Sequence, residues 1–454
     1  MPATACIPQL RLEFHPEGPV DVTFDAPQTS SDGGLLLLRQ IDDRLGLCAT
    51  IAAAIPDARD ARYVQHTRGE QIRQRVFQIA LGYEDANDAT TLRHDPLFKL
   101  VCDRSPTGVK GLSSQPTLSR LEHAATARAV VLVQRALEDS YVDELPTDTT
   151  VVVLDLDTTA DPVHGQQPFA FFHGHYDQTI YFPALVFDGA GRLVTVRLRP
   201  GNAGNYRYTV PLLDRVIRRI KARFPAAQVV VRGDAGFCAP RMLEALERLA
   251  AEFGDVDYVL GLEKNAVVLR AAAEAIAVAA AGFAETGVAT RVFTAFAYRA
   301  KKWSRERHVV AKAEHLDKGP NPRFVVTTLG EFPPRMLYEW AYCGRGQAEN
   351  YIKDFKNALE ADRLSCTTYV ANAFRLLLHA GAYRLMYALR AQVATVAPTL
   401  ATVQFDTLRL RLLKVAAHVR QSVRRITVAL PACFGLAAVF RAVAVLCGLP
   451  LPAS

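Results

Sequence analysis

The chain has 454 residues, half of them hydrophobic, which is enough for two or three domains with a sizeable buried core. Its net charge of +7 suits a polyanionic partner, although many soluble proteins are equally basic. The eight cysteines form no Cys-x-x-Cys pair, so we expect reduced thiols and exclude a disulfide framework or a cysteine zinc site. The N-terminus lacks the pattern of a secretory signal, and Arg441 and several prolines interrupt the apolar C-terminal tail. We therefore expect a cytoplasmic protein with no membrane partner and a buried terminal element.

Residues 1–145 are predicted to form a mostly helical N-terminal domain. An apolar-rich helix is expected over 34–55, another over 62–83, and a third from Pro116 onward. Short helices with scattered Arg and His suit a DNA-binding module. A plain helical bundle explains the pattern equally well.

Residues 146–263 change to a strand pattern. "TTVVVLDLD" at 149–157 predicts a strand, and 181–200 predicts a hairpin with its turn at 188–191. A helix, the strand "QVVVRGD" at 228–234, a second helix and the strand "VDYVLGLE" at 256–263 follow. This order predicts an α/β fold, with helices packed on a mixed sheet.

Residues 264–335 predict a β-rich basic insertion, because three strand-like segments occur there. Between positions 291 and 318 there are eight Lys or Arg residues and three acids. We expect a helix in 336–365 to return to the sheet core. Residues 366–454 are predicted to be mostly helical and basic, with no acidic residue after Asp406.

The segment "AYCGRGQAENYIKDFK" at 341–356 combines polar groups at helical spacing. At about 100° per residue, Tyr342, Arg345, Glu349 and Lys356 fall within about 60° of one another. A solvated helix face with an Arg–Glu pair four residues apart would also explain them. A neighbouring apolar stripe, suited to packing on a sheet, consists of Ala348, Ile352, Phe355 and Leu359.

Two further acids end apolar strand patterns. Asp157 ends "VVVLDLD" and Asp234 ends "VVVRGD", which places both at the C-terminal edge of a sheet, where α/β proteins bind ligands. A capping or turn role would explain each aspartate alone. Together with Glu349 they would form a set of three carboxylates, whose mutual repulsion a divalent cation such as Mg²⁺ would neutralise.

These motifs resemble those of a known family. Tyr342-x2-Arg345-x3-Glu349-x6-Lys356 is similar to the Tyr-Arg-Glu-Lys signature of DDE transposases from bacterial cut-and-paste insertion sequences. "DLDTT" and "RGDAGF" resemble their two aspartate motifs, in the same order. The resemblance covers most of the chain and extends to "FDAPQTSSDGG", "SQPTLSRLE", "DPVHGQQ" and "RPGN".

The resemblance implies an RNase H-like core, with the insertion placed between the second aspartate and the glutamate. It implies that the catalytic metal ligands are Asp157, Asp234 and Glu349, which would hold Mg²⁺, with Mn²⁺ as a substitute. It also implies that the phosphates of the element's ends are contacted by Tyr342, Arg345 and Lys356.

Two positions near the first aspartate keep alternatives open. Strand parity places Asp155 on the same side as Asp157, and the family's Asp-x-Thr pattern favours Asp157 through Thr159. The pair His173 and His175 could belong to a transition-metal site, but a strand edge or loop explains it better.

Two tryptophans carry separate expectations. Trp303 lies among basic residues that include Arg305, and similar enzymes use an aromatic of the insertion to stack on a flipped base. A packed hairpin tryptophan is the alternative. Trp340 is expected in the core.

The resemblance implies a transposase that binds the terminal inverted repeats of its element on double-stranded DNA. Metal-activated water would cleave a strand at each end, and the freed 3′-OH would attack DNA in a transesterification. Synapsis of two ends implies a homodimer, associated with the nucleoid when it is bound to DNA. A nuclease without strand transfer and a non-catalytic DNA-binding relic are the alternatives.

Overall fold

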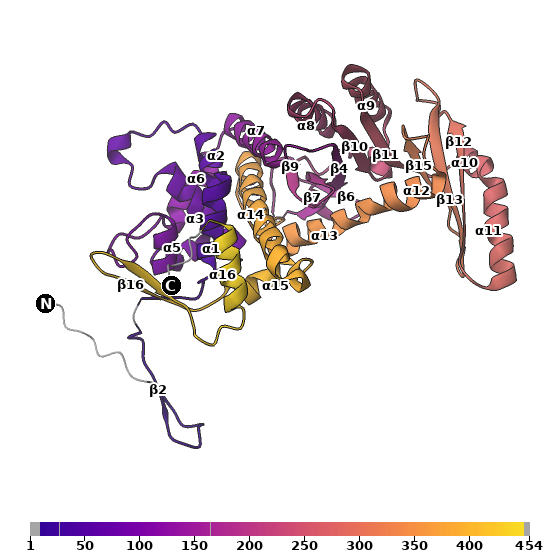
Figure 1. Ribbon diagram of the computed structural model, residues 1–454. Helices are drawn as coiled ribbons and strands as arrows, with labels where there is room; N and C mark the ends of the chain where they lie inside the picture. Colours follow the sequence, from indigo (N-terminus) through magenta and orange to yellow (C-terminus); the bar gives the residue numbers. More distant parts are fainter. Residues whose placement is uncertain (1–9, 27, 164, 449–454) are drawn as a thin grey trace.

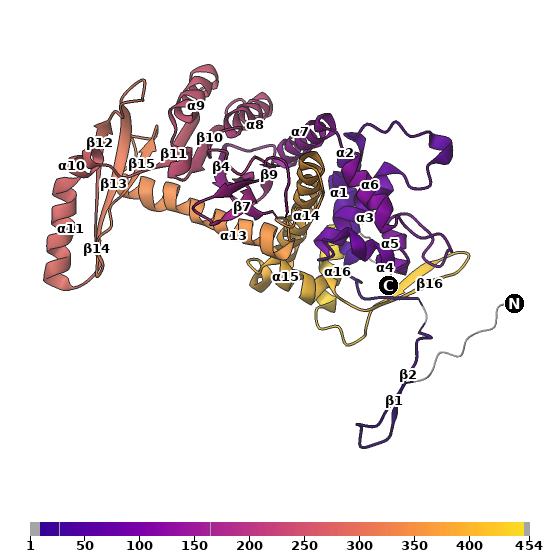
Figure 2. The same ribbon diagram turned by 180° about the vertical axis from the view of Figure 1, so that it is seen from behind.

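The computed structural model describes residues 10–26, 28–163 and 165–448 (Figure 1). Three parts follow one another across the molecule, as Figure 2 shows from behind. They are a helical body (residues 35–144 and 369–446), a central sheet, and a projecting arm (residues 266–316). The N-terminal segment for which the sequence predicts no secretory signal lies outside the described residues at positions 1–9, as do the last residues of the apolar tail. No helix in the described ranges is long and apolar enough to span a bilayer.

The central sheet is mixed, as the sequence predicts. Strands β4, β10 and β11 are parallel, and the other neighbouring pairs are antiparallel. The parallel strands are joined through helices α8 (Thr209–Arg223) and α9 (Pro240–Phe253). In spatial order the strands are β12 (Thr290–Tyr298), β13 (Arg307–Leu316), β15 (Arg323–Thr327), β11 (Val256–Leu262), β10 (Gln228–Gly233), β4 (Val151–Thr158), β8 (Ala184–Asp188) and β9 (Leu193–Arg197), with β14 (Gly319–Pro320) paired to β13.

The predicted hairpin is formed by β8 and β9. Its turn is closed by the Asp188 carboxylate, which accepts hydrogen bonds from the backbone N–H groups of Ala190 and Arg192. A second small sheet, which sequence patterns did not predict, lies between β4 and β8. Its strands have only two to four residues, too few for a recognisable alternation: β5 (Asp161–Pro162), β6 (Phe171–His173) and β7 (Gln178–Tyr181).

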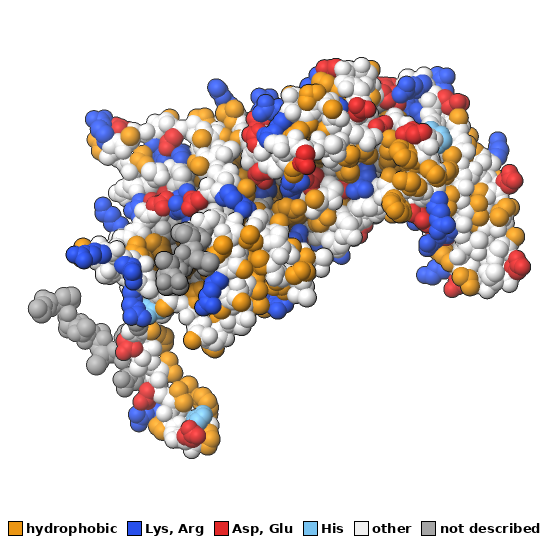
Figure 3. Space-filling model, in the orientation of Figure 1, with side chains coloured by type: hydrophobic (Ala, Val, Ile, Leu, Met, Phe, Trp, Pro, Cys, Tyr) orange, Lys and Arg blue, Asp and Glu red, His pale blue; other side chains and the backbone are white. Residues whose placement is uncertain are grey.

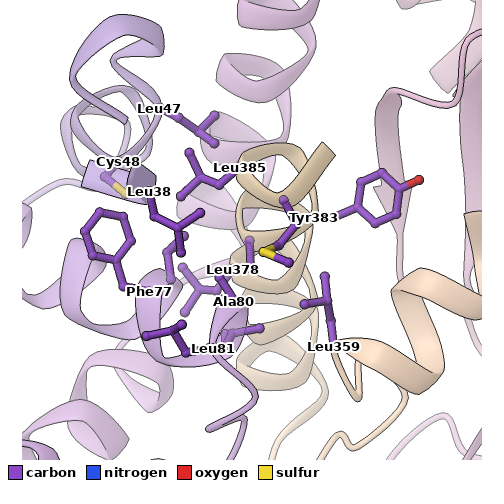
Figure 4. Packing of buried hydrophobic residues seen from close by; sticks show 14 of the residues in the cluster. Leu38, Leu47, Cys48, Phe77, Ala80, Leu81, Leu359, Leu378, Tyr383 and Leu385 are labelled. Carbon is purple, nitrogen blue, oxygen red and sulfur yellow. The ribbon is translucent and has the colours of Figure 1, made fainter. Parts of the chain in front are cut away.

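The N-terminal helices form one body with the C-terminal region. Helix α14 (Tyr369–Val396) packs against α1, α3 and α7, and Figure 4 shows its Leu378 and Leu385 among N-terminal side chains. The expected single helix over 34–55 is divided at Gly46, which adopts a left-handed conformation with φ 64°. The helices are α1 (Leu35–Leu45), α2 (Leu47–Ala53), α3 (Arg68–Ala80), α4 (Ala89–Leu92), α5 (Pro96–Val101), α6 (Gln115–His123) and α7 (Ala127–Glu144).

Most of the remaining elements complete this body, whereas β1 and β2 form a separate, largely exposed hairpin (Figure 1). The terminal helix α16 packs on α14 and α1 and buries Val443, as expected of a buried terminal element. Strand β16 pairs with β3, so a segment of the C-terminal region is joined to one of the N-terminal region. These elements are β1 (Leu10–Leu12), β2 (Val20–Val22), β3 (Thr29–Ser30), α15 (Phe405–Leu408), β16 (Ala417–Gln421), β17 (Ile426–Ala429) and α16 (Ala437–Leu446).

The insertion differs from its β-rich prediction in its first half. Helices α10 (Ala266–Ala271) and α11 (Ala273–Thr286) precede its strands, because this alanine-rich stretch has high helix propensity. The prediction that Trp340 lies in the core is wrong, since its side chain is 74% exposed. Leu337 and Tyr338 occupy the buried positions of that helical turn, which leaves Trp340 facing outward.

Burial of His379 on α14 predicts a pH dependence of stability. Its Nδ1–H donates to the carbonyl of Leu359 at 2.9 Å, and burial, reinforced by nearby arginines, lowers its pKa well below 6.5. Below pH 6.5 the imidazole of His379 binds a proton in the unfolded chain but not in the folded one. The contribution of neutral His379 to the free energy of unfolding is therefore complete above pH 6.5 and is lost as the pH falls below it. We expect the urea midpoint to fall with pH in this range and to fall less steeply in His379→Gln. A His15→Gln control, at an exposed position, should retain the wild-type slope. Equal slopes for both variants would contradict this role of His379.

Candidate active site

The four polar signature residues between Tyr342 and Lys356 lie on a continuous helical segment that crosses the sheet edge. Its winding alternates between wide and tight turns, so equal steps of about 100° only approximate its faces. Ala348, Phe355 and Leu359 are buried and Ile352 packs on the core, which confirms the predicted apolar stripe. The segment comprises α12 (Pro334–Met336), η4 (Leu337–Tyr342), η5 (Cys343–Gly346), α13 (Gln347–Lys353) and η6 (Asp354–Ala358).

Asp155 has a structural partner. Arg232, directly opposite on β10, donates to both of its carboxylate oxygens at 2.6 and 2.7 Å. A further guanidinium nitrogen donates to the carbonyl of Ala341, so one arginine links β4, β10 and the helical segment. A Cβ at Gly344 would lie 2.7 Å from this guanidinium, so the glycine allows the close approach. Both oxygens of Asp155 are therefore committed inside the fold.

Asp157 lies two residues further, at the end of β4. Its Oδ2 accepts from an Arg345 nitrogen at 3.1 Å, and its Oδ1 accepts from the backbone N–H of Thr158. Burial raises the pKa of Asp157 to about 6, against the opposing positive charge of Arg345. The negative charges of Asp234 and Glu349 raise it further, so the three predicted acids interact electrostatically.

Asp234 follows β10, where its Oδ1 accepts from the N–H of Gly236 at 2.9 Å, a contact that the capping or turn alternative describes. Gly261 on β11 lies beside it. A Cβ there would lie 2.7 Å from both the Tyr342 hydroxyl and the backbone nitrogen of Ala235. Tyr342 therefore reaches the aspartate's turn only because position 261 lacks a side chain.

Glu349 projects from α13 and is exposed. Among the residues that the structure describes, no group of three or more His, Cys, Asp or Glu side chains is arranged so that it could hold a metal ion. The Arg345 guanidinium instead compensates Asp157. The donor types nevertheless fit a hard divalent cation, since Asp157, Asp234 and Glu349 offer only carboxylate oxygens.

Lys356 is held by the segment after β4. Its ammonium donates to the carbonyl of Ala160 at 2.6 Å and lies 3.3 Å from Asp362. Burial raises the pKa of neighbouring Asp161 well above 3.8, opposed by the charge of Lys356. Lys356 thus lies near the same edge, engaged with protein groups.

A family comparison identifies the kind of protein to which the chain belongs. The model described as "Transposase DDE domain group 1" matches residues 14–449. The chain belongs to this transposase family. Membership implies an enzyme that cleaves and transfers DNA strands.

Other comparisons add little. No curated protein matches the transposase. A piggyBac transposase synaptic complex with hairpin DNA is 12% identical, with 84% of this chain and 82% of that chain covered and a TM-score of 0.39. An Aquifex aeolicus Argonaute is also 12% identical, with 45% and 27% covered and a TM-score of 0.19. Scores this low carry no argument about this transposase.

Trp303 of the transposase lies inside the insertion. It is 5% exposed, with the Tyr298 ring 5.3 Å away and the Arg307 guanidinium 5.0 Å from its centroid. This location matches the packed-hairpin alternative. Arg305 is exposed and 3.1 Å from Glu247.

Three residues of the site were not singled out as candidates in the sequence. Arg232 joins the sheet edge to the helical segment, and the Asn205 amide lies against Gly236. Burial, followed by the negative charges of Asp157 and Asp234, raises the pKa of Tyr176. Asn205 lies three residues after "RPGN", so this motif is a sequence signal near the site, whereas Tyr176 lies nine residues after "DPVHGQQ". Their spatial relation depends on loop folding that no periodicity encodes.

Neutralisation of the two aspartates of β4 should change the free energy of unfolding by different amounts. Asp155→Asn leaves Arg232 buried without its counter-charge and should reduce the free energy of unfolding by about 3–5 kcal/mol. Asp157→Asn should change it by about 1 kcal/mol or less, because the removed desolvation cost offsets the lost Arg345 contact. Urea denaturation at neutral pH measures both. Equal destabilisation would contradict the division into a structural and a site aspartate.

Proposed function

We propose that the transposase binds the terminal inverted repeats of an insertion sequence and cuts and joins DNA at this sheet edge. The observation that supports the proposal is that the negative charges of Asp234 and Glu349 act on the pKa of Asp157 at the end of β4. Arg345 and Tyr342 lie beside them. Asp155 is less suited to the first catalytic position, because Arg232 occupies both of its oxygens.

We further propose that five strands form an RNase H-like core. The spatial order β9-β8-β4-β10-β11 places the first strand of this unit at the centre, with β4, β10 and β11 parallel. In this arrangement the acids at the ends of β4 and β10 lie on adjacent strands at one edge, where ligands of α/β sheets bind.

Divalent metal ions are general in this family, and the carboxylates of Asp157, Asp234 and Glu349 would hold Mg²⁺ or Mn²⁺ here. Such ions supply activation of water or a 3′-OH and stabilisation of the leaving oxygen. Arg345 adds a charge-assisted donor for a phosphate oxygen, because its Nε has no hydrogen-bond partner within the described ranges. Tyr342 would orient the DNA backbone beside Asp234.

Double-stranded DNA is the proposed partner, at the element's ends and at the target. The basic insertion carries eight Lys or Arg against three acids over 291–318. Figure 3 shows Lys and Arg side chains on the projecting arm and a hollow between this arm and the rest of the molecule. Because two ends must be held together, we propose a homodimer in the synaptic complex.

Loss of each acid tests the proposal. Asp157→Ala, Asp234→Ala and Glu349→Ala should each abolish Mg²⁺-dependent cleavage of end DNA and leave end binding largely intact, since each removes a proposed metal ligand but no base-reading group. Labelled end duplexes with the flanking inverted repeat report cleavage on denaturing gels, and gel shifts report binding. Near-normal cleavage by one variant would remove that residue from the catalytic set.

Pre-cleaved ends with a free 3′-OH distinguish a transposase reaction from a nuclease. The wild type should join them to target DNA, whereas a nuclease would cut but not join. End binding with neither reaction in wild-type protein would identify a DNA-binding relic and overturn the catalytic proposal.

The proposed phosphate contacts of Arg345 and Lys356 predict a dependence of end binding on salt. Arg345→Ala and Lys356→Ala should weaken end binding and reduce the slope of log K against log salt by about 0.9 for each lost phosphate contact. Arg248→Ala, an exposed position on α9, is the matched control and should retain the wild-type slope. An unchanged slope for Lys356→Ala would show that Lys356 only anchors the Ala160 segment.

A further inference from the structure

The ammonium group of Lys356 is held by two segments that lie far apart in the sequence. The carbonyl of Ala160, three residues after Asp157, accepts from it at 2.6 Å, and the carboxylate of Asp362 lies 3.3 Å away. The side chains of Lys356 and Asp362 are 21% and 27% exposed, so this ion pair lies at the surface without being fully solvated. Because an ammonium has three N–H groups, these two contacts leave at least one N–H for a ligand.

The backbone of Asp362 is fixed by contacts that do not involve the lysine. Its carbonyl accepts from the N–H of Leu364 at 2.9 Å. Ala361 and Leu364 on either side of it are buried. The guanidinium of the next residue, Arg363, pairs with Glu84 of the helical body. The turn therefore presents the carboxylate from a well-anchored position between η6 and α14.

A second acid lies on the interior side of this arrangement. Asp161 is 1% exposed, and neither of its carboxylate oxygens has a hydrogen-bond partner within the described ranges. Burial raises the pKa of Asp161, the charge of Lys356 opposes this rise, and the charge of Asp362 adds to it. The three groups are therefore close enough to act on one another, and Lys356 is attracted by acids from both segments that hold it.

We propose that Asp362 is a positioning residue, which holds the ammonium of Lys356 at the sheet edge for a phosphate of the DNA backbone. This inference rests on the proposed phosphate contact of Lys356. A lysine side chain has many rotamers, and binding a phosphate orders it at a cost in entropy. A fixed carboxylate that orders the side chain beforehand removes part of this cost.

Glu360 provides a control that separates positioning from general electrostatics. A carboxylate near DNA repels phosphates, so its removal should by itself strengthen binding. Glu360 is exposed and lines the same pocket of about 510 Å³ as Asp362, whereas the ion pair of Lys356 is formed with Asp362. Neutralisation of either acid takes one negative charge from this pocket, but only neutralisation of Asp362 releases the lysine.

A double-mutant cycle tests the positioning role. The full-length wild type, Asp362→Asn, Glu360→Gln, Lys356→Ala and the double variant Asp362→Asn/Lys356→Ala are titrated with end duplexes in Ca²⁺ at several salt concentrations. We expect Asp362→Asn to bind ends about 2- to 12-fold more weakly than Glu360→Gln, with a smaller slope of log K against log salt. In the Lys356→Ala background, Asp362→Asn should cause no further loss. Thermal midpoints confirm that each variant is folded.

Each other outcome is decisive. Binding by Asp362→Asn that equals or exceeds that of Glu360→Gln would overturn the inference, because Asp362 would then be neutral toward the phosphate or compete with it. A loss of equal size in both backgrounds would assign Asp362 a structural role. If Lys356→Ala binds like the wild type, the phosphate contact fails and the inference with it. Absence of end binding by the wild type would instead refute the proposed function.

Discussion

The buried ion pair between Asp155 and Arg232 is the contact on which the arrangement of the site depends. Both carboxylate oxygens are occupied, and the same guanidinium reaches the carbonyl of Ala341. The helical segment is thereby fixed against β4 and β10, the two strands that end in Asp157 and Asp234. A buried charge that lost its partner would be costly, so this link resists changes of register between strand and helix. Gly344 is required because any side chain would collide with Arg232.

Electrostatic balance explains the next layer of the site. Asp157 is buried near two other carboxylates, which disfavours its ionised form, and Arg345 provides the opposing charge. The Arg345 contact is formed across the chain, between the helical segment and the end of β4. A cation that bound the three acids would supply the same compensation and release the guanidinium toward a phosphate. Arg345 and the three acids are thus linked electrostatically at the end of β4.

The helical body supports this edge from behind. Tyr383 of α14 packs against Phe187 and Phe355, and its hydroxyl donates to the carbonyl of Gly191 in the β8–β9 turn. The long helix therefore contacts the N-terminal helices on one side and the sheet hairpin on the other. The N-terminal and C-terminal regions, which the sequence analysis treats as separate domains, share a continuous hydrophobic core.

Local sequence patterns alone were enough to predict many of the protein's secondary-structure elements. Apolar runs ending in Asp157 and Asp234, the Asp188 turn and the stripe containing Phe355 all depend on neighbouring residues, so periodicity predicted the strands, hairpin and packed helix face. Motif spacing indicated the family. Tertiary structure decided which aspartate of β4 is committed to Arg232, since strand parity treats Asp155 and Asp157 alike. It also decided that Trp303 is buried and Trp340 exposed, and that Tyr176 borders the acids. These features depend on contacts between distant segments, whose energies become defined only when the chain has folded.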